Sequence, residues 1–231
     1  MKCLGLLGGM SWQSTETYYR LINEGVGARL GGLHSARLLM SSIDFAPLEE
    51  MQAAGDWEAA ADLLANEARL LEGAGADAIL VCTNTMHNVA DTIEQATSVP
   101  LLHIADAAGE ELTQRAFSKV ALLGTRFTME QDFYKQRLID RFGLDVIVPN
   151  AAQRQVVHDI IYQELCRGDI REQSRRDYLE IIERLSGKGA ECVILGCTEI
   201  GLLVEQPHTN TPLMDTTQVH ASAAVSFLLD P

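Results

Sequence analysis

Short aliphatic runs, each ended by a small or polar residue, recur along the whole chain. The clearest lie at residues 4–7, 36–40, 78–81, 101–104, 120–123, 145–148, 192–195 and 213–214. Between them, apolar residues recur at helical spacing in the segments 57–72, 129–142, 155–166 and 170–185. Continuous apolar strands are typical of a parallel sheet covered on both faces, and their alternation with helices indicates βαβ units. The pattern therefore predicts an α/β fold.

The second half of the chain repeats three segments of the first half in the same order. Residues 73–84 (GAGADAILVCTN) align without gaps with residues 187–198 (GKGAECVILGCT). At nearly the same offset, residues 4–8 match 120–124 and residues 100–102 match 212–214. All parallel strands look somewhat alike, but the shared glycine-rich prefix favours a duplication. We predict two similar domains related by a pseudo-twofold axis, formed by residues 1–105 with 214–231 and by residues 106–213, each with a parallel four-stranded sheet flanked by helices.

Composition narrows the range of partners. The 231 residues carry a formal net charge of −14, with 47% apolar and 22% charged residues, as in an ordinary soluble globular protein. So acidic a chain would repel a phosphate backbone, which argues against nucleic acid and anionic membrane surfaces as partners. An anionic small substrate would need a local positive site.

The cysteines point to a reduced compartment. They are odd in number and show neither paired nor zinc-like spacing: Cys3, Cys82, Cys166, Cys192 and Cys197. The N-terminal apolar run is too short for an export signal, and no stretch has the length needed to cross a bilayer. We expect a cytoplasmic protein with free thiols and no metal site.

The repeat places Thr83 and Cys197 at equivalent strand ends. Ligands of α/β sheets bind beyond the carboxyl ends of the strands, so a pseudo-twofold would bring this hydroxyl and this thiol to opposite sides of one cleft. A proton could leave one face of a substrate carbon there while another arrives on the opposite face, which is how a stereocentre is inverted. Free N–H groups of a helix after each strand would bind a carboxylate and lower the pKa of Cys197.

The motifs that carry this chemistry also carry a family resemblance. They are residues 8–11 (GGMS) with 14–15 and 18–19, residues 83–87 (TNTMH), residues 119–125, residues 196–199 (GCTE), and residues 215–217 with His220. The chain resembles the cofactor-independent aspartate/glutamate racemase family over essentially its whole length. The resemblance implies an acidic amino acid in a cleft between two α/β domains, no pyridoxal phosphate, and a homodimer. It also implies that Cys197 takes the proton from the L-enantiomer.

The sequence departs from the family at the first strand end. Family members usually have Cys-Asn-Thr there, whereas this chain has Thr83 at that position and Cys82 one place earlier. Because successive strand residues point to opposite faces, Cys82 should pack inward, unless a bulge turns it toward the cleft. The Thr/Cys pair resembles the bacterial L-aspartate/glutamate-specific or broad-specificity racemases. An alcohol is a poor base, so turnover should be slow.

Further residues are candidate substrate ligands, each with a structural alternative. The candidates are Met10, Gln52, Asn84, Thr85, Thr125, Arg167, Thr198 and Glu199. Asn84, Thr85 and Thr198 could instead cap helices, and Glu199 could simply favour a helix N-terminus rather than orient the ammonium group. Arg167 could bind the side-chain carboxylate of the substrate, or could only complement a helix C-terminus. His87 could tune the site or pack, whereas His103 and His220 are expected to be structural.

Two other functions stay open. The first is a decarboxylase of the same superfamily, which would use a single cysteine to protonate an enediolate on one face. The second is a non-catalytic amino-acid-binding protein, in which Thr83 marks lost chemistry. The four lysines lie at strand starts, in a helix and in a glycine turn, which argues against a Schiff-base cofactor: Lys2, Lys119, Lys135 and Lys188.

Overall fold

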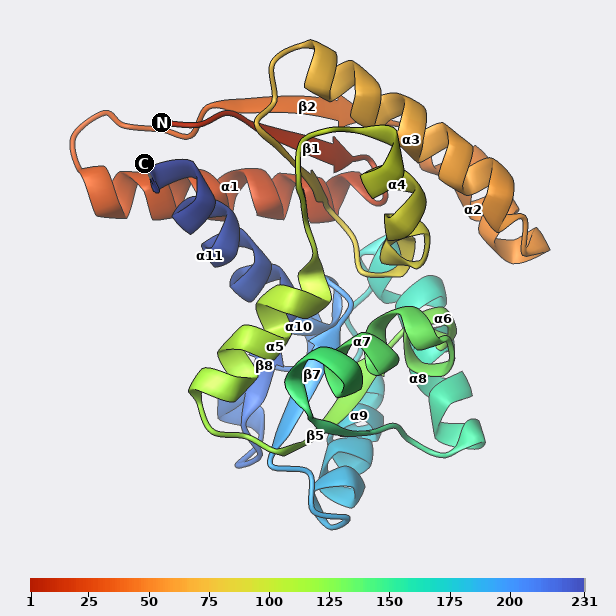
Figure 1. The fold of residues 1–231 in the computed structure, drawn as a ribbon. Helices are drawn as coiled ribbons and strands as arrows, with labels where there is room; N and C mark the ends of the chain where they lie inside the picture. Colours follow the sequence, from red (N-terminus) through yellow and green to blue (C-terminus); the bar gives the residue numbers. More distant parts are fainter. Residues whose placement is uncertain (231) are drawn as a thin grey trace. The chain divides into compact units, whose positions relative to one another are not determined.

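The computed structural model describes residues 1–230, which fold as two α/β units. The first unit comprises Met1–Ile104 and the C-terminal segment from His220, and the second comprises Ala105–Val219. The chain therefore passes from one unit to the other twice, after Ile104 and after Val219. Each unit contains one parallel four-stranded sheet with helices packed around it (Figure 1).

The sheet of the first unit has the strand order β2-β1-β3-β4, and all of its pairings are parallel. Its strands are β1 (Leu4–Gly8), β2 (Leu38–Ser42), β3 (Ala78–Val81) and β4 (Leu101–Leu102). Its helices are α1 (Trp12–Leu30), α2 (Phe45–Ala54), α3 (Trp57–Gly73), η1 (Thr85–Val89), α4 (Ala90–Ala96) and, from His220 onward, α11 (Thr216–Leu229). The η elements are 3₁₀ helices.

Side-chain alternation along β1 and β3 separates two apolar clusters in this unit. Leu7, Ile79 and Val81 pack with α2, α3 and α4 on one face of the sheet. Leu6 and Leu80 pack with α1 and α11 on the other, as the two layers of helices in Figure 1 show. Both central strands are therefore fully covered, which is why the sequence shows continuous apolar runs there.

The second unit repeats this arrangement with the strand order β6-β5-β7-β8. Its strands are β5 (Lys119–Gly124), β6 (Asp145–Ile147), β7 (Cys192–Gly196) and β8 (Leu213–Asp215). Its helices are α5 (Ile104–Gln114), α6 (Arg126–Glu130), α7 (Asp132–Phe142), α8 (Ala151–Gln163), η2 (Leu165–Arg167), α9 (Glu172–Ser186), α10 (Ile200–Leu203) and η3 (Gln206–His208). The predicted α/β class with two parallel four-stranded sheets is confirmed.

The second passage between the units lies later in the chain than the predicted boundary at residues 213/214. Leu213–Asp215 pair in parallel with β7 and so complete the second sheet rather than the first. The repeat itself indicates this assignment. It matches Leu213 with Leu101, which lies in the last strand of the first sheet, so Leu213 should lie in the last strand of the second. The predicted helix over 129–142 is also divided, since α6 ends at Glu130 and α7 starts at Asp132.

Three histidine rings lie together in the interior of the first unit. His87 has ring-centroid distances of 4.6 Å to His103 and 5.7 Å to His220. His220 Nε2 lies 2.8 Å from the Leu102 carbonyl oxygen, and its Nδ1 lies 2.9 Å from the Tyr18 hydroxyl. A carbonyl only accepts, so Nε2 carries the proton and Nδ1 accepts from Tyr18. Burial lowers the pKa of His220 to about 4 and, with the neighbouring rings, lowers the pKa of His87 well below its ordinary value.

These buried histidines should make the protein less stable at mildly acidic pH. An unfolded histidine takes up a proton near pH ~6.5, whereas His220 in the folded protein stays neutral until about pH 4. Its contribution to stability is therefore fully present above about pH 6.5 and is lost as the pH falls, by up to about 1.4 kcal/mol per pH unit. Urea unfolding at about pH 7 and about pH 5 measures this loss.

The variant His220→Gln retains a donor for the Leu102 carbonyl oxygen but does not titrate, so its free energy of unfolding should fall less over this range. His34→Gln, at an exposed position, should keep the pH dependence of the parent. Equal losses in the parent and in His220→Gln would contradict this assignment.

No helix within residues 1–230 combines the length and the apolar character needed to span a membrane.

Candidate active site

In the first unit, the chain segments beyond β1 and β3 are tied to the start of α1. The Ser14 hydroxyl donates to the Cys82 carbonyl oxygen at 2.6 Å, and the Thr15 hydroxyl accepts from the Gly9 N–H at 2.8 Å. Gly9 has a φ of +92°, and a Cβ there would lie 2.1 Å from the Ile43 carbonyl oxygen. Ile43 follows β2, and only glycine permits this close approach of the exits of β1 and β2.

Cys82 and Thr83 differ in burial, as expected if Cys82 packs into the core. Cys82 is fully buried in the apolar cluster with Leu6 and Leu80, and burial raises the pKa of its thiol. Thr83 is half-buried beyond the carboxyl end of β3. The inward packing of Cys82 is therefore confirmed, and the alternative in which a bulge turns Cys82 toward the site is wrong.

In the second unit, Cys197 directly follows β7 and contacts a carboxylate. Its Sγ lies 3.0 Å from Glu199 Oε2, and the Thr198 hydroxyl donates to the same oxygen at 2.6 Å. Cys197 is half-buried and Glu199 is buried. Burial, reinforced by the Glu199 carboxylate and by Cys166, raises the pKa of the Cys197 thiol well above its ordinary value. The thiol is thus the donor of this hydrogen bond and the carboxylate is the acceptor.

The expected lowering of the Cys197 pKa by a helix N-terminus is wrong. The helix that follows, α10, runs only from Ile200 to Leu203, and its N-cap residue Glu199 makes no side-chain capping hydrogen bond. So short a helix carries little dipole, while an adjacent carboxylate opposes a second negative charge. The helix beyond β3 is the 3₁₀ helix η1, and Asn84 does not cap it through its side chain.

The candidate ligands of the first unit lie in two places. Asn84 and Thr85 follow Thr83 and are both buried, at the carboxyl end of β3. Met10 is buried in the apolar cluster with Leu7, and Gln52 donates from Nε2 to the Met86 sulfur at 2.9 Å from a buried position on α2. These positions adjoin the exits of β1 and β3, and their role as substrate ligands stays a prediction.

The candidate ligands of the second unit are more scattered. Thr125 follows β5, and its hydroxyl accepts from the Thr128 N–H at 3.3 Å, which caps α6. Glu199 accepts from both the Cys197 thiol and the Thr198 hydroxyl, as described. Arg167 ends the 3₁₀ helix η2 at an exposed position. The role of each in binding substrate stays a prediction.

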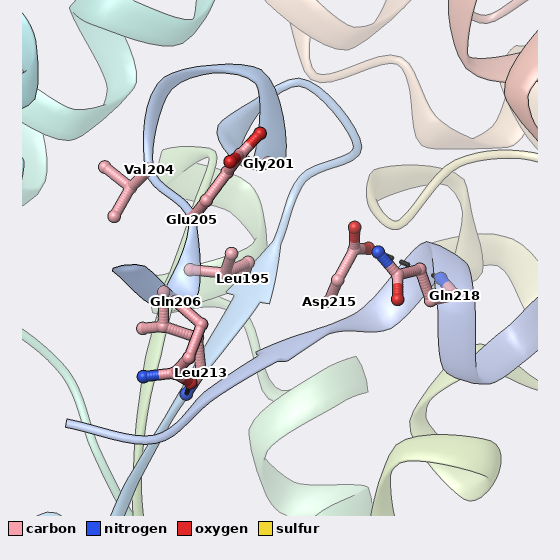
Figure 2. Close-up of a pocket in the computed structure, with 8 residues that line it drawn as sticks. All are labelled: Leu195, Gly201, Val204, Glu205, Gln206, Leu213, Asp215 and Gln218. Atoms are coloured by element: carbon pink, nitrogen blue, oxygen red, sulfur yellow. Dashed lines mark hydrogen bonds between the residues drawn. The ribbon is translucent and has the colours of Figure 1, made fainter. Parts of the chain in front are cut away.

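The second unit also contains a cavity of about 320 Å³ beside β7 and β8 (Figure 2). Its lining residues are Leu195, Gly201, Val204, Glu205, Gln206, Leu213, Asp215 and Gln218. Asp215 accepts from the Thr217 and Gln218 N–H groups at 2.8 and 3.4 Å, and burial raises the pKa of its carboxyl. None of the predicted site residues lines this cavity.

Comparison with known proteins identifies the family. The Asp/Glu/hydantoin racemase family matches residues 7–224. The chain belongs to this family. Its sequence is 53% identical to that of a candidate Asp/Glu racemase from Yersinia pestis, and comparison with the crystal structure of that protein gives a TM-score of 0.94 over the full length of both chains. An aspartate racemase homologue from Pyrococcus horikoshii OT3 is 33% identical, with a TM-score of 0.86, also over both full lengths.

Among curated proteins, the chain is similar to the broad specificity amino-acid racemase RacX of Bacillus subtilis (strain 168). The two are 28% identical over 159 residues, which cover 69% of this chain and 68% of RacX. Membership of the racemase family, inferred from the two strand-end motifs, is therefore confirmed.

Sequence reasoning missed two features of the site. It weighed Glu199 as a ligand or a helix residue, although its carboxylate contacts the catalytic candidate Cys197. The signal was an acidic residue two positions after a cysteine, which is too common to interpret without the geometry of the turn. It also left His87 undecided, whereas the His87 ring lies 2.8 Å from the carbonyl oxygen of Thr83.

Replacing Glu199 with glutamine should lower the pKa of the Cys197 thiol. The substitution keeps an acceptor for the thiol but removes the negative charge, which is the largest cause of the raised pKa after burial. The rate of Cys197 alkylation by iodoacetamide, followed by peptide mass spectrometry across pH, should rise at lower pH than in the parent. Glu180→Gln, at an exposed position, is the matched control. An unchanged alkylation profile in Glu199→Gln would show that the carboxylate does not act on the thiol.

Proposed function

We propose that the protein is an amino acid racemase that interconverts the L- and D-forms of aspartate and glutamate without a cofactor, Cys197 and Thr83 acting on opposite faces of the substrate α-carbon. Membership of the Asp/Glu/hydantoin racemase family supports the reaction type. The similarity to RacX, a broad specificity enzyme, supports a range of further amino acids as substrates. The observation that carries the mechanism is the contact of the Cys197 thiol with the Glu199 carboxylate.

The equivalence of the two strand ends supports the pairing of Thr83 with Cys197. β1 pairs with β3 as β5 pairs with β7, in the same parallel direction and at the same place in each sheet. Thr83 follows β3 and Cys197 follows β7. Each side chain thus lies beyond the carboxyl end of a central strand, where α/β proteins bind their ligands.

The Cys197–Glu199 contact supplies the proton acceptor that the raised thiol pKa requires. In the resting site the thiol is protonated and the carboxylate carries the charge. The thiol proton moves to Glu199 Oε2, which leaves a thiolate and a neutral carboxylic acid. The thiolate then takes the α-proton of the L-amino acid, the Cα–H bond breaks, and its electron pair is delocalised into the substrate carboxylate. The substrate ammonium group favours the thiolate by its positive charge.

On the other face, the Thr83 hydroxyl delivers a proton to the α-carbon. The resulting alkoxide takes a proton from water, and the Glu199 carboxylic acid gives its proton to the hydroxide so formed. This restores the hydroxyl, the carboxylate and the water, and balances the reaction. An alcohol is a far weaker acid than a thiol, so this half of the reaction is the slower one. Because the equilibrium constant of a racemisation is one, kcat/KM must be equal for the two enantiomers, and a preference can appear only in kcat or in KM separately.

The remaining roles follow from the chemistry of an acidic amino acid. We assign the substrate α-carboxylate to the backbone N–H groups and side chains of Asn84, Thr85 and Thr198, and the distal carboxylate to Arg167. Glu199 orients the substrate ammonium group, and Met10, Gln52 and Thr125 make further contacts with the substrate. The four lysines leave no Schiff-base candidate in this assignment, because Lys2 precedes β1, Lys119 pairs with Asp145, Lys135 lies in α7 and Lys188 in a turn. We further propose a cytoplasmic homodimer.

Replacing Cys197 with serine should remove activity in both directions. Loss of a general base costs about 10²–10⁴-fold, and serine cannot form the anion at neutral pH. The parent and the variant are incubated with L- and with D-aspartate in deuterated water. Loss of the Cα–H signal is followed by NMR, and the enantiomers are separated chromatographically.

Cys166→Ser is the matched control, since Cys166 is a partly buried thiol of the same unit, and it should retain activity. Full activity of Cys197→Ser would end this proposal. Carbon dioxide release from substituted malonates without racemisation would identify the decarboxylase instead. Binding of L-aspartate by the parent without Cα exchange would identify a non-catalytic protein.

Replacing Thr83 with cysteine should raise turnover from D-aspartate. A thiol has a pKa near ~8.5 and provides a usable base on the face where the hydroxyl is poor. Initial rates from each enantiomer give kcat separately for the two directions, and Thr83→Ser serves as the conservative control with an alcohol retained. A Thr83→Cys variant slower than Thr83→Ser from D-aspartate would contradict the role of Thr83.

A further inference from the structure

His87 holds the carbonyl group of the proposed catalytic residue Thr83. Its Nδ1 lies 2.8 Å from the Thr83 carbonyl oxygen, and its Nε2 accepts the Ile104 N–H at 3.2 Å. A carbonyl accepts and an N–H donates, so the ring must carry its proton on Nδ1 and none on Nε2. The contacts therefore fix both the tautomer and the neutral state of this side chain.

Hydrogen bonds hold the backbone both before and after Thr83, and His87 makes those that follow it. The Cys82 N–H donates to the Leu7 carbonyl oxygen at 2.9 Å, and the Cys82 carbonyl accepts from Ser14. After Thr83, the His87 ring holds the Thr83 carbonyl and the His87 N–H donates to the Asn84 carbonyl oxygen at 3.1 Å. The direction of the Thr83 hydroxyl thus depends on a peptide group that His87 orients.

The second contact of His87 is with Ile104, where the chain leaves the first unit. Ile104 is the last residue of the first unit before the chain enters the second, and it is also the first residue of α5. Its N–H is one of the donors that a helix leaves without a partner inside the helix, and the ring nitrogen satisfies it. One imidazole therefore joins the exit of β3 to the point where the chain leaves the unit.

The neighbours of His87 keep it in this state. His103 and His220 pack against its ring, and His87 itself is 1% exposed. Burial and these two rings lower the pKa of His87, and the carbonyls of Thr83 and Asn84 oppose this only in part. A neutral ring with one donor and one acceptor is what the two contacts require.

We propose that His87 is a positioning residue for the proposed racemisation. Its Nδ1–H holds the Thr83 carbonyl oxygen, while its Nε2 is anchored by the Ile104 N–H at the start of α5. This rests on the proposed function of Thr83 and Cys197. His87 does not touch the substrate in this scheme. Its effect is confined to the step on the Thr83 face, and removal of the α-proton by Cys197 does not depend on it.

Two substitutions separate the two contacts of the ring. Asparagine places an amide nitrogen near the position of Nδ1 and keeps the donor to Thr83, whereas glutamine places its oxygen near Nε2 and keeps the acceptor for Ile104. Each variant loses one contact. His87→Asn and His87→Gln are thus matched controls for each other, and urea unfolding shows whether their stabilities are comparable.

The readout is the partition of L-aspartate in deuterated water between deuterated L-aspartate and D-aspartate. Deuterated L-aspartate forms when Cys197 removes the proton and a deuteron returns to the same face, whereas D-aspartate requires Thr83. His87→Gln should lower the ratio of D-product to deuterated L-product by about tenfold to a hundredfold, as expected for a displaced catalytic group. His87→Asn should keep the ratio of the parent.

An unchanged ratio in His87→Gln, or an equal fall in both variants, would overturn the proposal, since a merely structural role lowers both products in proportion. A parent that neither exchanges nor inverts any amino acid would instead overturn the proposed function. If His87→Gln does not fold, NMR of the parent labelled with ¹⁵N-histidine decides. At least one histidine must be neutral with its proton on Nδ1, and a spectrum without such a ring contradicts the assignment.

Discussion

Parallel pairing of the central strands is the constraint from which the arrangement of each unit follows. Because β1 pairs with β3 and β5 with β7 in the same direction, the exits of both strands lie at one edge of their sheet. In the first unit this brings Gly9 and Thr83 to the same edge, and the hydroxyl groups at the start of α1 bind the backbone there. In the second unit it brings Thr125 and Cys197 to the equivalent edge.

The electrostatics of the second unit determine the protonation state of Cys197. A thiol next to a buried carboxylate does not rest as a thiolate, and the four-residue helix after it does not offset the carboxylate. The pair shares a single negative charge, and the proton that separates its two forms is the one that the proposed chemistry moves. The ends of β3 and β7 thus share a repeated backbone arrangement, and single side chains such as Glu199 give them different chemistry.

Much of this was predictable because the responsible signals are local or repeated. Apolar runs gave the strands, the repeat identified Thr83 and Cys197 as equivalent, and strand alternation placed Cys82 in the core. The predicted boundary after residue 213 lies too early, since Met214 and Asp215 continue the strand that Leu213 begins and pair with β7. The Glu199 and His87 contacts depend on the exact course of a turn, which spacing in sequence does not define.

The carboxylate beside Cys197 has a consequence for how the protein withstands oxidants. Peroxide attacks thiolates far faster than thiols, so a sulfur held in its protonated form is a poor target. Cys82 and Cys192 are fully buried, whereas Cys197 is partly accessible and is kept protonated by its partial burial together with the neighbouring charge. An intruding cation that neutralised Glu199 would therefore make this sulfur more open to sulfenic acid formation.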